Sequence, residues 1–203
     1  MKIICIGRNY PQHAKELRNE KPESPVIFIK PDTAILQKRY PFYIPVFSEE
    51  IHPEVEVVVK INRIGKYIKE EFAHKYYHEI GLGIDFTARD LQNSLKEKGL
   101  PWEKSKAFDG SALIGKFFDK EYFPDINDLE FELVKNGVVV QEGNTSEMLW
   151  NIDALIAEVS SYFTLKIGDV IFTGTPVGVG PIAKNDVLEG YLEAEKALMV
   201  KIK

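Results

Sequence analysis

The stretch Ile51-His52-Pro53-Glu54-Val55-Glu56-Val57-Val58-Val59 sets two carboxylates two residues apart at the start of an apolar run. Side chains alternate between the two faces of a strand, so Glu54 and Glu56 share one face and the odd-numbered valines share the other. Two carboxylates on one rigid face, joined by a third from elsewhere in the chain, suit a hard divalent cation. An amphipathic strand with its charges in water has the same pattern, so the other segments decide between these two interpretations.

Composition limits the class of protein. The chain has 203 residues, 44% hydrophobic and 28% charged, which is typical of a globular protein, and we expect residues 1–203 to form one domain. A net charge of −5 argues against nucleic acid or an anionic membrane as partner. No apolar run approaches the ~20 residues that span a bilayer, and the apolar N-terminal run is too short for a signal peptide. The one cysteine, Cys5, cannot form an internal disulfide and is expected to be a buried small hydrophobe, which favours a cytoplasmic protein.

Hydrophobic periodicity and turn residues predict strands and helices that do not alternate regularly. Apolar runs predict strands over residues 2–6, 26–30, 54–61, 82–86, 169–172 and 199–203. The pair Asn136-Gly137 predicts a hairpin between strands at 129–134 and 138–141. Helices are expected over 10–19, about 68–80, about 87–99 and 144–162. Strands outnumber helices, which indicates a β-rich α+β fold and not a doubly wound sheet.

Beside the Glu54/Glu56 strand, two segments carry polar residues that packing alone does not require. His13 and Glu16 lie at i and i+3 of the first helix, so the carboxylate can orient the imidazole, although a solvated surface pair has the same spacing. Asp85 stands inside an apolar strand, where a charge is costly unless it is paired or binds a metal. Arg89 and Gln92 follow from the end of that strand, one helical turn apart.

Two later segments are less distinctive when each is taken alone. Lys106 lies in the segment 102–110 and has no special pattern around it. The glycine-rich loop 173–181 offers backbone N–H groups and threonine hydroxyls to an anion. It lacks the lysine of a phosphate-binding loop and the helix that such a loop precedes, which argues against a nucleotide site.

Taken together, these segments resemble the fumarylacetoacetate hydrolase family, and the match in order and spacing covers nearly the whole chain. The chain is most similar to the short members that act as acylpyruvases and oxaloacetate decarboxylases, without the family's N-terminal SH3-like domain. It departs from the common pattern at Pro53, where a second histidine is usual, and at Val177, where glutamate is usual. The matching strings are Gly7-Arg8-Asn9-Tyr10 with His13 and Glu16, Phe28-Ile29-Lys30-Pro31, His52-Pro53-Glu54-Val55-Glu56, Asp85-Phe86-Thr87-Ala88-Arg89-Asp90-Leu91-Gln92, Gly99-Leu100-Pro101-Trp102, Lys106-Ala107-Phe108-Asp109, Asn136-Gly137 with Gln141, and Gly168-Asp169-Val170-Ile171-Phe172-Thr173-Gly174-Thr175-Pro176.

The resemblance implies a fold and a metal. The fold is a mixed β-sheet roll of the type of the family's C-terminal domain, with a short N-terminal lid segment at about 8–20, and the protein is expected to be a homodimer. Mg²⁺ or Mn²⁺ is expected on Glu54, Glu56 and Asp85, and all-oxygen ligands suit these ions better than Zn²⁺.

The resemblance also implies a substrate and a reaction. The substrate is a small 2-oxo acid, cleaved or decarboxylated through a pyruvate enolate that the metal stabilises. Lys106 supplies a second positive charge beside the enolate. The dyad of His13 and Glu16 activates the water that attacks an acylpyruvate. The substrate's polar groups are held by Arg89, Gln92 and Thr175.

Two other functions stay open on the sequence. Relatives on the same scaffold isomerise or hydrate 2-hydroxy-dienoates, as in 2-hydroxyhepta-2,4-diene-1,7-dioate isomerisation, and the dyad favours hydrolysis because a pure isomerase needs no activated water. A non-catalytic metal-binding protein is the third reading, which the intact carboxylates and dyad disfavour. The sequence leaves open the acyl group, the choice between Mg²⁺ and Mn²⁺, and the pathway.

Overall fold

Two sheets organise the chain in the computed structural model, which describes residues 1–12 and 22–203. The larger sheet has strand order β2-β1-β8-β3-β4-β5 and the smaller has β10-β9-β6-β7. The α-helices that lie wholly within the described residues are α2 (Glu70–Ala73), α3 (Arg89–Glu97), α4 (Glu103–Lys106) and α5 (Ile152–Tyr162), and the 3-10 turns there are η1 (Asp32–Ala34), η2 (Lys120–Tyr122) and η3 (Thr145–Glu147). The strands are β1 (Ile3–Gly7), β2 (Val26–Lys30), β3 (Ile51–Ile61), β4 (Tyr77–Ala88), β5 (Ala112–Asp119), β6 (Glu130–Lys135), β7 (Val138–Asn144), β8 (Val170–Phe172), β9 (Val187–Leu192) and β10 (Glu195–Lys201).

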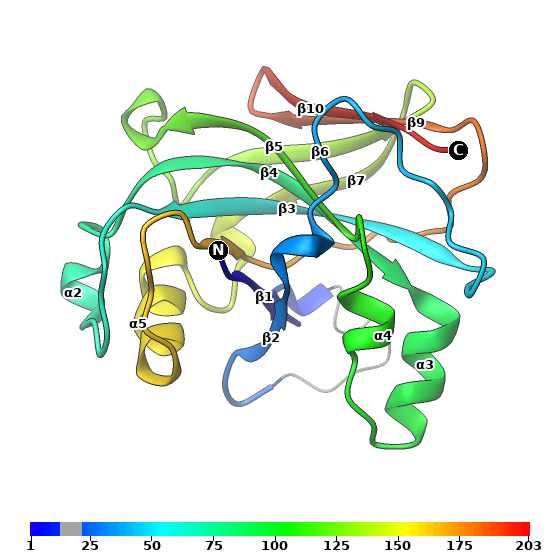
Figure 1. The fold of residues 1–203 in the computed structure, drawn as a ribbon. Helices are drawn as coiled ribbons and strands as arrows, with labels where there is room; N and C mark the ends of the chain where they lie inside the picture. The colour runs from blue at the N-terminus through cyan, green and yellow to red at the C-terminus, as the bar shows by residue number, and fades with distance from the viewer. Residues whose placement is uncertain (13–21) are drawn as a thin grey trace.

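The predicted strand-rich α+β fold with a mixed sheet is confirmed. Only β1 and β8 pair in parallel, and every other named pair is antiparallel across the described residues. Figure 1 shows the four-stranded sheet on one side of the long β3–β4 pair and the helices on the other. Within the described ranges, no helix is long and apolar enough to cross a bilayer.

The register of β3 follows from its valines. Val55, Val57 and Val59 are fully buried in the core that also contains Leu133 of β6 and Leu192 of β9. Burying each valine contributes ~1.5–3 kcal/mol, and a slip of one residue would turn the whole set away from this core. The alternation in the sequence therefore fixes the face that carries the carboxylates.

The prediction of a helix over about 68–80 is wrong. The structure has only one turn there, α2, and Tyr77 already begins β4. The apolar spacing of four also fits a strand, in which every second side chain points to the core. Gly81, expected as a helix stop, lies within β4 where β5 approaches closely, and a Cβ there would be 2.4 Å from the carbonyl oxygen of Lys116.

The other elements differ from the prediction mainly at their ends. The hairpin of β6 and β7 turns at Asn136 and Gly137, which have φ of 53° and 82°, the conformation that an Asn-Gly turn favours. The helix expected from Asn144 begins later, because Asn144 caps only η3 and Asn151 caps α5 by accepting from the Ala154 N–H at 2.9 Å. Cys5 is buried in β1 as expected. Strands β5 and β9 were not predicted.

Candidate active site

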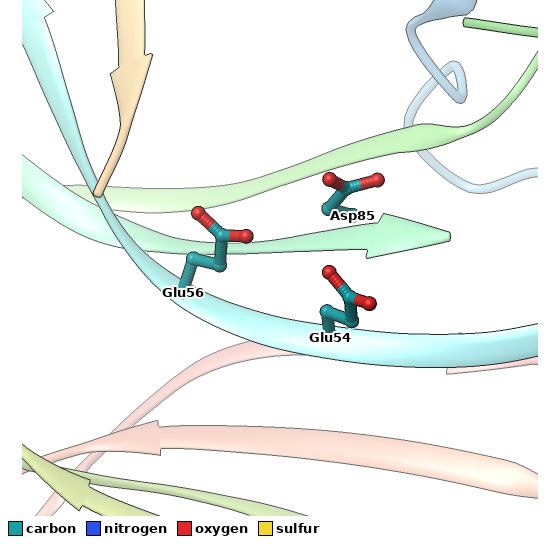
Figure 2. A group of neighbouring side chains, drawn as sticks. All are labelled: Glu54, Glu56 and Asp85. Atoms are coloured by element: carbon teal, nitrogen blue, oxygen red, sulfur yellow. The ribbon is translucent and has the colours of Figure 1, made fainter. Parts of the chain in front are cut away.

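Three carboxylates meet on two inner strands of the larger sheet. Glu54 and Glu56 lie on β3, and the register places Asp85 of β4 directly opposite Glu54. One ligand atom from each lies within 4.8 Å of the others, and the three residues are 6%, 2% and 0% exposed. Figure 2 shows them on the same side of the strand pair. The predicted shared face is confirmed, and the alternative of a strand with its charges in water is wrong.

Lys106 lies among these carboxylates. Its Nζ is 2.7 Å from Glu54 Oε2 and 2.9 Å from Asp85 Oδ2, and it donates to Thr87 Oγ1 at 2.5 Å. Burial lowers the pKa of Lys106, but the charges of Asp85 and Glu54 outweigh it and raise the pKa above its usual value. The lysine is therefore a buried cation. Thr87, which accepts from this lysine, is the next-to-last residue of β4 and not part of the helix expected over about 87–99.

A second buried lysine was not predicted as part of the site. Lys30, the last residue of β2, is fully buried, and its Nζ lies 2.7 Å from Asp85 Oδ1. It also donates to the backbone carbonyls of Lys106 and Ser111. Lys30 thus joins an edge strand to Asp85 and to the end of α4. The available signal in the sequence was a lysine that closes an otherwise apolar strand.

Glu56 is paired differently from the other two carboxylates. Its Oε2 accepts from the Gly174 N–H at 2.7 Å, and no lysine or arginine among the described residues lies within ion-pair distance. Burial, followed by repulsion from Asp85 and Glu54, raises the pKa of Glu56 well above its usual value. A buried carboxylate without a cation is costly unless it takes up a proton or faces a metal ion.

Arg89 organises the rim of the cavity at the start of α3. Its guanidinium pairs with Glu54, donates to Gln92 Oε1 at 2.6 Å and lies 3.3 Å from His52 Nδ1. His52 Nε2 lies 2.9 Å from Glu50, which assigns the ring proton to Nε2. Burial and the Arg89 charge lower the pKa of His52, so the ring is neutral. Each of the three guanidinium nitrogens of Arg89 therefore donates to a protein group, and the bond to Oε1 fixes the orientation of Gln92.

Two uncharged groups are oriented in a similar way. Gln92 accepts from Arg89 through Oε1, and no described acceptor takes its amide hydrogens. Thr175 Oγ1 accepts from Gln141 Nε2 at 2.9 Å, which leaves the hydroxyl proton to be donated elsewhere. Gln141 is itself held, because its Oε1 accepts from the Val55 N–H at 3.0 Å. Both Gln92 and Thr175 can therefore donate into the cavity.

These groups line one cavity of about 40 Å³, larger than the ~10–15 Å³ that one water needs. The predicted site residues in the described part of the chain all meet there: Glu54, Glu56, Asp85, Arg89, Gln92, Lys106 and Thr175. His13 and Glu16 lie outside the described residues. Arg8 and Lys96 also line the cavity and were not predicted.

Comparison with known proteins supports the family resemblance found in the sequence. The family model described as fumarylacetoacetate (FAA) hydrolase C-terminal matches residues 2–202. The chain is 41% identical over 201 residues to the mitochondrial oxaloacetate tautomerase of Mus musculus, covering 99% of this chain and 91% of the relative. It is 42% identical over 189 residues to a mitochondrial oxaloacetate decarboxylase of Dictyostelium discoideum, covering 93% and 87%.

A solved structure has the same fold. Fumarylpyruvate hydrolase from Pseudomonas aeruginosa, in complex with Mn²⁺ and pyruvate, superposes with a TM-score of 0.94 at 31% identity, covering 100% of this chain and 89% of that one. Family model, relatives and structure agree over almost the full length. The resemblance found in the sequence is confirmed, and the chain belongs to the fumarylacetoacetate hydrolase family.

Proposed function

We propose that this protein is a Mg²⁺- or Mn²⁺-dependent enzyme that acts on a small 2-oxo acid at the carbon next to its carbonyl group. The observation that carries the proposal is Glu56, a buried carboxylate without a cationic partner in the described chain, beside Glu54 and Asp85. Three buried oxygen ligands suit a hard divalent cation, and Glu54, Glu56 and Asp85 would hold it. When bound, the cation supplies the positive charge that stabilises a developing enolate oxygen.

The chain's own residues add charge and orientation. Lys106 stays protonated because of its raised pKa, so it holds a second fixed positive charge at the carboxylate cluster. Gln92 and Thr175 donate hydrogen bonds to the oxygens of the 2-oxo acid, each held by a neighbouring side chain. Arg89, whose donors bind Glu54, Gln92 and His52, positions these groups, and its remaining N–H donors would contact the polar groups of the substrate.

Oxaloacetate is the substrate that the relatives favour. In decarboxylation the bond between C3 and C4 breaks, CO₂ leaves, and the electron pair passes to the C2 oxygen as the enolate of pyruvate, which takes up a proton at C3. In tautomerisation a proton leaves C3 and one is added at the C2 oxygen, without cleavage. Both reactions place negative charge on the same oxygen, so the same cationic groups serve both.

Hydrolysis of an acylpyruvate is the second candidate. The similarity to a fumarylpyruvate hydrolase crystallised with Mn²⁺ and pyruvate supports it. This reaction needs an activated water, and we propose His13, oriented by Glu16, as the general base. His13→Ala should lower acylpyruvate hydrolysis by ~10²–10⁴-fold and affect oxaloacetate turnover less.

A substrate panel tests the proposal. The protein is assayed with Mg²⁺ or Mn²⁺ on oxaloacetate, acetylpyruvate and fumarylpyruvate, following pyruvate release and the ultraviolet absorbance of the enol. Pyruvate release from oxaloacetate indicates decarboxylation, and enol loss without pyruvate indicates tautomerisation. Pyruvate release from the acylpyruvates indicates hydrolysis. Turnover that survives chelation of divalent metal, or that Glu56→Gln leaves unchanged, would contradict the metal assignment.

We also propose a homodimer, as the resemblance implies. Sedimentation equilibrium should then give twice the 23.2 kDa of the chain. A mass of one chain at micromolar concentration would contradict the dimer.

A further inference from the structure

Two cationic side chains of the cavity, Arg8 and Lys96, form no ion pair with a carboxylate of the described residues. Arg89 and Lys106 are paired with Glu54, and Lys106 also with Asp85. In contrast, no carboxylate in the described ranges lies within ion-pair distance of Arg8 or Lys96, although both line the cavity.

The position of Lys96 follows from α3. It lies four residues after Gln92 and seven after Arg89, so these three side chains share one face of the nine-residue helix. Its ammonium lies 5.4 Å from the centre of the Trp102 ring, which also lines the cavity. The contact holds the cation at the cavity wall and adds no negative counter-charge.

Arg8 reaches the cavity through an unusual backbone. Its φ is +62°, a conformation that costs a non-glycine residue roughly 1 kcal/mol or more. The next residue, Asn9, is fully buried and fixes this turn by donating to the carbonyl of Thr173 at 2.8 Å and accepting from the Trp150 N–H at 2.9 Å. The fold thus maintains a strained residue whose side chain lines the cavity.

The two cations also repel each other and their neighbours. Burial, followed by the charges of Arg89, Lys106 and Arg8, lowers the pKa of Lys96 to about 8. Three carboxylates and four cationic side chains line the cavity in the described chain, before any divalent ion adds its two charges. An excess of positive charge in a small cavity favours a ligand with more than one negative charge.

We propose that Lys96, assisted by Arg8, binds a second carboxylate of the substrate, so that the enzyme prefers 2-oxo dicarboxylates to 2-oxo monocarboxylates. The inference rests on the proposed function for the position of the first carboxylate, at Gln92 and Thr175 beside the acidic cluster. It assigns Lys96 a role in specificity, distinct from the stabilisation of the enolate by Lys106. A charge-assisted hydrogen bond of this kind changes affinity by about 10–100-fold.

Two five-carbon acids that differ only at the distal end test the proposal. 2-Oxoglutarate ends in a carboxylate and 2-oxopentanoate ends in a methyl group. Titration calorimetry on the Mg²⁺-loaded protein should show at least ~10-fold tighter binding of 2-oxoglutarate. Lys96→Met should remove this preference and Lys96→Arg should keep it. Lys98→Met, which removes an exposed charge two residues away, is the matched control and should change nothing.

Arg8→Asn gives an independent second test, because asparagine tolerates the left-handed backbone while the positive charge and the long guanidinium side chain are removed. It should reduce the preference in the same direction. Equal binding of the two acids, no binding of either, or a preference that survives Lys96→Met would overturn the proposal. If the wild type turns over no 2-oxo acid, the proposed function fails, while the binding preference is judged separately. If oxaloacetate is turned over but the preference is absent, only the distal carboxylate site is wrong.

Discussion

At the scale of single residues, Glu56 and Lys106 differ in whether their charge has a partner of opposite sign. Glu56 is a buried anion with one backbone donor, whereas Lys106 is a buried cation with two carboxylates and a hydroxyl. An added cation would stabilise the charge of Glu56, whereas Lys106 already has carboxylates as counter-charges. Substitutions at the two positions should therefore have different signatures in stability and in catalysis.

Glu56→Gln should abolish the stabilisation that Mn²⁺ gives, because the carboxylate that most needs a cation is gone. Without metal the variant should be at least as stable as the wild type, since a buried unpaired charge has been replaced by a neutral amide. Melting temperatures with and without Mn²⁺ measure both effects. An undiminished Mn²⁺ shift in the variant would show that the ion binds elsewhere.

Lys106→Met should lower kcat and kcat/KM together, by ~10²-fold or more, if the lysine stabilises charge that develops during the reaction. Lys104→Met is the matched control, because Lys104 lies on the same short helix with its side chain exposed. Steady-state kinetics on oxaloacetate distinguish the roles. A change confined to KM would instead indicate that Lys106 only binds the ground state of the substrate.

At the scale of elements, Lys30 links the edge strand β2 to Asp85 of β4. Lys30→Met removes one partner of a fully buried ion pair and should lower the free energy of unfolding by ~3–5 kcal/mol. Lys60→Met is the comparison, because the Lys60–Glu79 pair is a cross-strand pair with both side chains more than a third exposed, and its loss should cost at most ~1 kcal/mol. Urea unfolding of both variants measures the difference. Equal losses would mean that burial does not strengthen the Lys30 pair.

The elements also show where sequence reasoning succeeds. The alternation in residues 51–59 predicted which face of β3 carries the carboxylates, because the valines need the core. The same kind of reasoning was wrong at 68–80. Apolar residues that recur every fourth position there fit a turn followed by a strand as well as they fit a helix. Local periodicity cannot separate these cases, since the choice depends on pairing with β5.

The site residues that were missed depend on contacts distant in sequence. Lys30 meets Asp85 only because β2 and α4 come together, and Gln141 meets Thr175 across 34 residues. Arg8 and Lys96 carry no local pattern that marks a cavity. The family resemblance identified the residues that most members share, whereas these neighbours require the folded chain.

At the scale of the whole molecule, the acidic cluster couples metal binding to folding. Its residues lie on β3 and β4, two long inner strands of the larger sheet, so an ion held there stabilises the folded chain as a unit. Protons compete with that ion for Glu56. The global stability should therefore depend on pH in opposite directions without and with metal.

The metal-free protein should lose stability, relative to Glu56→Gln, as pH rises above about 4.5, the usual pKa of a glutamate. Burial and the nearby carboxylates raise the folded pKa of Glu56 above its unfolded value, so the folded state binds the proton more tightly. That contribution is complete below the unfolded pKa and disappears as pH rises through the folded pKa. The Mn²⁺-induced rise in melting temperature should instead grow over the same range, because the ion needs the deprotonated carboxylate. Thermal melts of both proteins across this range, with and without Mn²⁺, measure the two trends. If the Mn²⁺ effect is independent of pH, proton and metal do not compete at Glu56.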